Sequence, residues 1–161
     1  PELSHHEERT VRRIREELDK LGIPNITVGH NNVIGTLEGG KPGKKIAIRA
    51  DIDALPVAEA NEVPYKSKVE GVMHACGHDC HTAMLLTAAL VLQETREEWG
   101  GVVRLAFQPA EESGEGALSM IAQGALEAST PASRCTSGRT SPQDGSVSFL
   151  VPAWRAPTGS R

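Results

Sequence analysis

The chain has 161 residues, of which 39% are hydrophobic and 24% charged, and its formal net charge is −4. This length suits one domain with a real hydrophobic core. The mildly acidic balance and the scarcity of aromatic residues argue against nucleic acid as a partner. No apolar run is long enough to span a bilayer, so we expect no membrane contact and a cytoplasmic location. Three cysteines, an odd number, favour metal or redox chemistry over a disulfide framework.

The first expected element is a helix that begins at a capping-box pattern, Ser4-x-x-Glu7. Apolar residues follow at helical spacing, and Gly22 and Pro24 end the helix; they are Val11, Ile14, Leu18 and Leu21. Next, residues 26–28 and 33–37 are expected to form paired strands around a turn at two asparagines.

Residues 45–51 (KIAIRAD) are typical of a buried strand, and we expect the preceding glycine-rich residues 39–43 to form a loop. Asp51 and Asp53 lie at the carboxyl end of this strand. Strand ends are where sites are built in α/β sheets, although a lone aspartate there more often caps a turn. These two carboxylates gain interest only from the residues downstream.

A dense group of potential metal ligands lies in the sequence HACGHDCH, residues 74–81. The segment holds three of the six histidines and two of the three cysteines of the chain. Imidazole, thiolate and carboxylate are the ligands that a borderline-soft ion such as Zn²⁺ selects. Gly77 lets the backbone turn sharply, so that Cys76 and His78 can aim at one point. The segment therefore predicts a metal site.

A helix is expected over residues 82–98, apolar nearly all round and therefore buried, with Met84 in the core. Its positive dipole end would favour a thiolate in the preceding segment. A strand over residues 102–108 leads to the pair Glu111-Glu112, and a helix over 117–126 follows. This order of elements predicts an α/β sandwich, with a central mixed sheet flanked by helices.

The residues alone suggest a metal-dependent hydrolase. Cys76 and His78 would be ligands and Glu112 a third, which leaves positions open for water and substrate. Glu111 would take the proton of the water and pass it to the leaving nitrogen. Two alternatives stay open at this point: Cys76 as a nucleophile with a histidine base, and a structural zinc site.

Four segments in the same order resemble the co-catalytic di-metal amidohydrolases, in the branch of hippurate hydrolases, aminoacylases and indole-acetyl-amino-acid hydrolases. They are PELS (residues 1–4), RADIDALP (49–56), HACGHD (74–79) and FQPAEE (107–112). The resemblance implies hydrolysis of an N-acyl amino acid, a small-molecule substrate, into a carboxylate and a free amino acid. Two divalent ions, of zinc, manganese, cobalt or nickel, would share the nucleophilic water in the full-length site.

The resemblance also assigns roles to single residues. Metal ligands would be Cys76, which bridges the two ions, together with His78 and Glu112. Glu111 would be the general base, and Asp53 would orient the site from behind. The family has two further histidine ligands after the glutamate pair, and full-length members are often homo-oligomeric through an inserted domain. We find neither feature in this sequence, so residues 1–127 are expected to be the N-terminal portion of the catalytic domain.

Residues 128–161 differ in composition from the rest, with seven serines, four threonines, four prolines and no lysine. Codons permitted for residues 135–142, regrouped by one base, encode Leu-His-Val-Trp-Pro-Asp-Leu-Pro, which matches the family pattern at this point. We therefore expect residues 128–161 to be an out-of-frame, poorly ordered tail. The expected function is that of a truncated, weakly active amidohydrolase, and the alternative is a non-catalytic metal-binding fragment.

Overall fold

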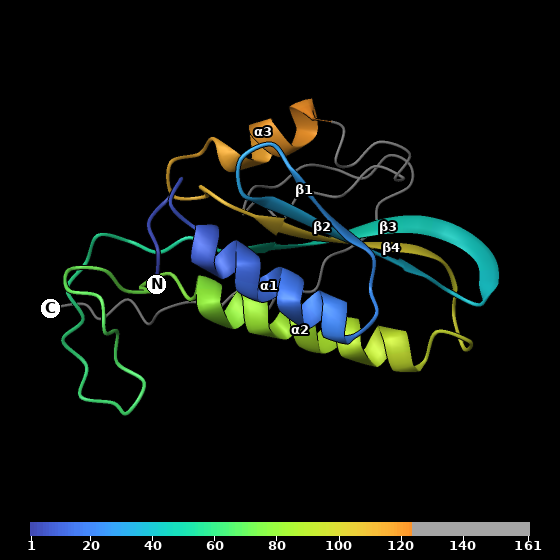
Figure 1. The fold of residues 1–161 in the computed structure, drawn as a ribbon, viewed down its shortest axis with the longest axis horizontal. Helices are drawn as coiled ribbons and strands as arrows, with labels where there is room; N and C mark the ends of the chain where they lie inside the picture. Colours follow the sequence, from blue (N-terminus) through green and yellow to red (C-terminus); the bar gives the residue numbers. More distant parts are fainter. Residues whose placement is uncertain (124–161) are drawn as a thin grey trace, which may run out of the picture.

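The computed structural model describes residues 1–123, which form a four-stranded sheet between two layers of helices (Figure 1). The elements in chain order are α1 (Glu8–Lys20), β1 (Asn25–Val28), β2 (Asn32–Glu38), β3 (Lys41–Asp51), α2 (His78–Glu94), β4 (Gly100–Gln108) and α3 (Gly116–Ala122). The expected tail, residues 128–161, lies outside the described residues. No helix among the described residues is long and apolar enough to cross a membrane.

The sheet is mixed, as predicted. Its strand order is β1-β2-β4-β3; β2 runs antiparallel to both β1 and β4, whereas β3 and β4 are parallel. Because β3 and β4 are parallel, their carboxyl ends meet at one edge, where Asp51 pairs with Gln108. This edge is where the predicted site residues gather.

Two hydrophobic clusters hold the layers together. Alternate residues of the strands face opposite sides of the sheet. On one side Leu105 and Phe107 pack in a cluster with residues of α1 and α2, including Ile14 and Leu85. On the other side a smaller cluster joins the sheet to α3 through Met120. The predicted α/β sandwich is therefore confirmed.

The first helix buries three of the four apolar residues that its periodicity predicted, but Leu21 is partly buried at the C-cap and the capping box is not formed. Val11, Ile14 and Leu18 are buried in α1, as expected. Glu7 is the N-cap residue and makes no side-chain cap hydrogen bond. The Ser4 hydroxyl instead donates to Asp53 Oδ2 at 2.7 Å, 49 residues away in sequence. A tertiary contact thus replaces the local pattern.

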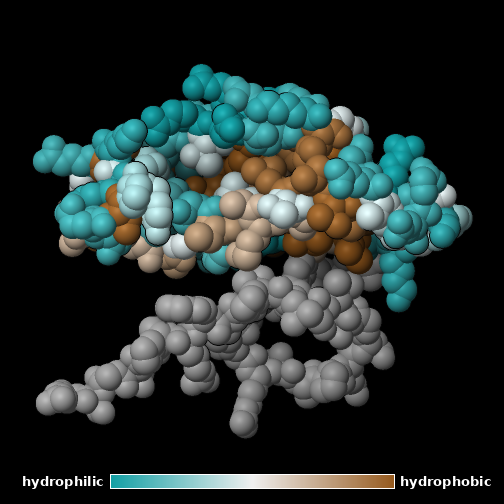
Figure 2. Space-filling view, turned by 90° about the horizontal axis from the view of Figure 1, so that it is seen from below, coloured by the Kyte–Doolittle hydropathy of each residue, from teal (hydrophilic) through white to brown (hydrophobic). Residues whose placement is uncertain are grey.

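Two other expectations of local structure are wrong in part. Residues 39–43 are not a loop throughout, because β3 already begins at Lys41, with an irregular register between Lys41 and Lys45. The long helix spans His78–Glu94 instead of residues 82–98. It is also not buried all round: Met84 is 49% exposed and Val91 52% exposed. Figure 2 shows hydrophobic residues gathered on the side of the molecule where α2 lies.

Candidate metal centre

The candidate centre lies at the edge of the sheet where β3 and β4 end and α2 begins. Gly77 occupies the N-cap position of α2 with a φ of 80°, in the left-handed region that residues with a Cβ disfavour. This turn directs the chain from Cys76 into the helix, so that His78 opens α2 facing the ends of both strands. The sequence role assigned to Gly77 agrees with this geometry.

Three predicted ligands come together here. Ligand atoms of Cys76, His78 and Glu112 all lie within 4.8 Å of one another. His78 Nε2 is 3.7 Å from Glu112 Oε1, and the His78 side chain is 2% exposed, whereas Cys76 is exposed. A buried imidazole beside an accessible thiol and carboxylate leaves one side of the group open to solvent.

The orientation of His78 is set by Asp53. His78 Nδ1 lies 2.8 Å from the Asp53 carbonyl oxygen and 3.1 Å from Asp53 Oδ1. Both are acceptors, so Nδ1 carries the proton and donates, and the lone pair of Nε2 remains for an ion. Burial raises the pKa of the Asp53 carboxyl, but hydrogen bonds from His78, Ser4 and the Glu112 backbone outweigh it and hold that pKa below its usual range.

The thiol of Cys76 is not pre-activated. Burial first, and then the Glu112 carboxylate, raise its pKa above the ordinary value. This is opposite to the expected effect of the helix dipole, because burial and the neighbouring carboxylates both disfavour the thiolate. A protonated thiol argues against the alternative of Cys76 as a nucleophile. A bound cation would reverse this electrostatic balance, and thiol, imidazole and carboxylate are the donor set that a borderline-soft divalent ion accepts. The residues therefore fit such an ion.

A second group of possible ligands shares His78. Asp51, His78 and His81 also place ligand atoms within 4.8 Å of one another, and His81 Nδ1 makes a close contact with Asp51 Oδ1. Because Asp53 occupies His78 Nδ1, only Nε2 can bind an ion, so both groups describe one side of the same centre. The sequence placed Asp51 and His81 nearby but gave neither of them a role.

Glu111 lies beside the group without belonging to it. Its Oε2 accepts a hydrogen bond from Gln108 Nε2 at 2.7 Å and a close one from the Arg49 guanidinium. Arg49 also donates to Asp51 Oδ2 at 3.2 Å. Both contacts of the Glu111 carboxylate are made through Oε2, so Oε1 stands outside them. The sequence alone gave no role to Arg49, because its partner Glu111 lies 62 residues away and is brought close only by folding.

His74, the first residue of the predicted ligand segment, belongs to neither group among the described residues. Its Nδ1 is buried without a hydrogen-bond partner in this part of the chain, and burial lowers the pKa of the ring.

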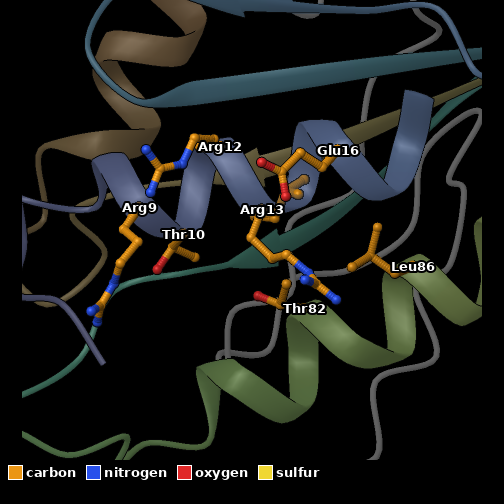
Figure 3. Close-up of a pocket in the computed structure, with 8 residues that line it drawn as sticks. Arg9, Thr10, Arg12, Arg13, Glu16, Thr82 and Leu86 are labelled. Carbon is orange, nitrogen blue, oxygen red and sulfur yellow. The ribbon is translucent and has the colours of Figure 1, made fainter. Parts of the chain in front are cut away.

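A groove of about 660 Å³ lies away from the candidate centre, between α1 and α2 (Figure 3). Arginines of α1 and Thr82 and Leu86 of α2 line it, and none of the candidate ligands does.

A protein-family model and several characterised relatives match this chain. Residues 47–151 match the peptidase family M20/M25/M40. The chain is 52% identical over 130 residues to thermostable carboxypeptidase 2 of Saccharolobus solfataricus, covering 78% of this chain and 33% of the relative. It is 46% identical over 131 residues to the N-acetylcysteine deacetylase of Bacillus subtilis, with 78% and 34% covered. It is 48% identical over 131 residues to IAA-amino acid hydrolase ILR1-like 5 of Arabidopsis thaliana, with 79% and 29% covered.

Solved structures of similar proteins share the fold of this chain. The YXEP protein of Bacillus subtilis, described as a dinuclear metal binding peptidase, superposes with a TM-score of 0.78 at 45% identity, covering 81% of this chain and 37% of that one. A putative aminohydrolase from methicillin-resistant Staphylococcus aureus superposes with a TM-score of 0.77 at 44% identity, covering 81% and 35%. The chain thus spans about a third of the length of these relatives.

Proposed function

The chain belongs to the peptidase family M20/M25/M40, and on this premise we propose that it forms part of a metal-dependent amidohydrolase acting on N-acyl amino acids. The observation that carries the proposal is the convergence of Cys76, His78 and Glu112 within 4.8 Å at the sheet edge. The substrate class is supported by relatives named as an N-acetylcysteine deacetylase and an IAA-amino acid hydrolase. Aminoacylase and hippurate hydrolase activities belong to the same chemical class.

In this proposal, Cys76, His78 and Glu112 hold a divalent ion of zinc, manganese, cobalt or nickel, and the complete site holds two such ions. The bound ion supplies Lewis acidity and a water of lowered pKa. Asp53 fixes the tautomer and ring orientation of His78 through the hydrogen bonds to Nδ1. The description of a similar structure as dinuclear supports the count of two ions.

Glu111 is the proposed general base. Arg49 and Gln108 hold its Oε2, which fixes the orientation of the carboxylate while Oε1 faces no contact from either residue. Glu111 would take a proton from the attacking water and deliver it to the leaving nitrogen of the amide. Its neighbour Glu112 is turned to His78, so the adjacent carboxylates serve different tasks.

A second candidate is a metal-binding fragment without catalysis. It is favoured by one observation: the chain spans about a third of the length of its relatives. Metal analysis does not separate the two candidates, because both hold an ion. Turnover of an N-acyl amino acid does.

A chimera tests the proposal on the residues themselves. Residues 1–123 would replace the equivalent segment of the Bacillus subtilis N-acetylcysteine deacetylase, and release of free amino acid would be followed. We expect the chimera to hydrolyse its substrate, and Glu111→Gln to lower kcat by 10²–10⁴-fold, the range typical for a general base. Glu98→Gln, an exposed glutamate, is the control and should leave the rate unchanged. Full activity of the Glu111→Gln chimera would refute the assignment.

A further inference from the structure

Glu7 is a buried carboxylate for which the proposed chemistry has no use. Glu7 is 0% exposed, and its carboxylate belongs to neither group of possible metal ligands. An ionised carboxylate taken out of water needs several hydrogen-bond donors to compensate it. Its partners therefore show what the chain gains by burying it.

Three donors from three different segments converge on Glu7. Oε1 accepts the backbone N–H of His5 at 3.0 Å and that of Ala110 at 2.9 Å. Oε2 accepts Asn31 Nδ2 at 2.9 Å. These donors come from the start of the chain, from the β1–β2 turn and from the segment after β4. That last segment contains Glu111 and Glu112. One carboxylate thus joins segments up to 103 residues apart.

The same three residues share an uncommon backbone conformation. Within residues 1–123, the non-glycine residues with positive φ are His5 at 68°, Asn31 at 62° and Ala110 at 51°. The left-handed region is disfavoured for residues with a Cβ, and they stay there only when surrounding contacts fix them. Each of these residues donates a hydrogen bond to Glu7. The carboxylate therefore stands at the point where the three strained turns meet.

The turn at Ala110 matters most for the metal centre, because Glu111 and Glu112 follow it directly. After this turn, the Glu112 backbone N–H donates to Asp53 Oδ2 at 3.1 Å, and the Glu112 carboxylate faces His78. Ala110 itself is 1% exposed, so its backbone has no solvent to replace a lost partner. A change in its conformation would turn both glutamates away from their present positions.

We propose that Glu7 is a positioning residue that locks the left-handed turn at Ala110 and thereby aims Glu112 at the metal ion and Glu111 at the substrate. This role rests on the proposed function of the metal centre. Glu7 belongs to neither group of possible metal ligands, and it acts through the backbone N–H of Ala110. The effect is of the kind seen when groups behind a metal ligand are changed, which typically costs 10–100-fold in metal affinity.

The test exchanges donor and acceptor between Glu7 and Asn31 in the 161-residue chain. Asn31→Asp puts a second carboxylate against Glu7 and removes the donor, while an aspartate still tolerates positive φ. In the double variant Asn31→Asp with Glu7→Gln, the glutamine amide donates to the new carboxylate, and its oxygen accepts both backbone N–H groups. Asn61→Asp adds the same charge at an exposed position and serves as the control.

Two measurements report whether Glu7 holds the turn at Ala110. One is the Co²⁺ affinity, from the thiolate–cobalt absorption of Cys76, and the other is the hydrogen-exchange rate of the Ala110 amide. We expect Asn31→Asp to lower Co²⁺ affinity by 10–100-fold and to speed exchange at Ala110, and the double variant to recover both. If Asn31→Asp does not fold, recovery of a folded, cobalt-binding double variant still supports the proposal, and failure to recover overturns it.

The two possible failures give different results. Equal Co²⁺ affinity in the parent and in Asn31→Asp would overturn the positioning role while leaving the metal centre in place. A parent chain that binds no Co²⁺ through Cys76 would overturn the proposed metal centre, and the positioning role with it.

Discussion

His78 is the residue on which the candidate centre depends, because its two ring nitrogens have separate tasks. Nδ1 is committed to Asp53, and Nε2 points to the space shared with Cys76 and Glu112. The ring is 2% exposed, so its hydrogen bonds are not exchanged for water. An imidazole held in this way is prepared to bind an ion before the ion arrives.

At the residue scale, we predict that metal binding requires Cys76 and His78 and does not require Cys80. Cys80 lies in the same segment, but the structure places it in neither ligand group of the described residues. Protein purified without chelator should contain zinc, manganese, cobalt or nickel by elemental analysis. The double variant Cys76→Ser with His78→Ala should lose it, whereas Cys80→Ser keeps it. Unchanged metal content in the double variant would show that the ligands are wrong.

Ligand types and their spacing were sufficient to nominate Cys76, His78 and Glu112, because few combinations of side chains suit a borderline-soft ion. The residues that support them were not predictable in this way. Ser4 and Glu7 fit a local capping box, yet Ser4 donates to Asp53 and Glu7 accepts from Ala110. A local sequence pattern indicates only which hydrogen bonds neighbouring residues could make. Ser4 and Glu7 instead bond to residues far along the chain, which folding brings close.

At the scale of elements, strong apolar periodicity correctly predicted which face of a helix is buried, whereas the predicted ends of the elements were less accurate. The apolar spacing in α1 predicted its buried face, whereas α2 begins four residues before the expected position, at His78. The start was missed because the first turn of α2, residues 78–81, has no apolar period. The burial of α2 was overestimated because composition does not tell how many faces of a helix find a partner. In the described residues, one face packs on the sheet through Leu85 and Ala89.

The turn that starts α2 gives a prediction at this scale, through Gly77→Ala. Gly77 has a φ of 80°, and a Cβ there would meet no atom within 4 Å, so the cost is backbone strain alone, about 1–2 kcal/mol. We expect a lower urea midpoint and weaker metal binding, because the strain is relieved by moving Cys76 relative to His78.

Gly22 offers a matched control for this change. It has a φ of 67° and equally open surroundings, but it lies at the end of α1, away from the ligands. Gly22→Ala should cost a similar amount of stability and leave metal affinity unchanged. Equal losses of affinity in both variants would mean that global stability, and not the geometry of the α2 turn, controls metal binding.

At the scale of the whole molecule, the site exists because two parallel strands end together. The alternation of strands and helices was enough to predict the α/β sandwich. It did not predict that β2 and β4 pair antiparallel while β3 and β4 pair in parallel, which brings Asp51 beside Gln108. Pairing between strands distant in sequence leaves no local pattern to read. The cytoplasmic location and the nature of residues 128–161 stay predictions.

The last prediction concerns the activity of the 161-residue chain, which we expect to be a weak or inactive enzyme. The described residues supply Cys76, His78 and Glu112, and a site for two ions needs further ligands and contacts that position the substrate. No histidine follows His81 in the sequence, whereas the resemblance implies two histidine ligands after the glutamate pair. Removing a single preorganised group from such a site costs about 10²–10³-fold in kcat, so we expect the lack of both histidines to cost on the order of 10⁴-fold or more. A gene whose reading frame is shifted by one base after the codon of Glu127, and which is then read through the inserted domain to the natural end of the protein, should restore hydrolysis of N-acyl amino acids such as hippurate. Glu111→Ala in that protein should abolish it again. Equal rates of the 161-residue chain and the frame-restored protein would show that residues 1–127 already contain all the chemistry, and that the proposed requirement for further ligands is wrong.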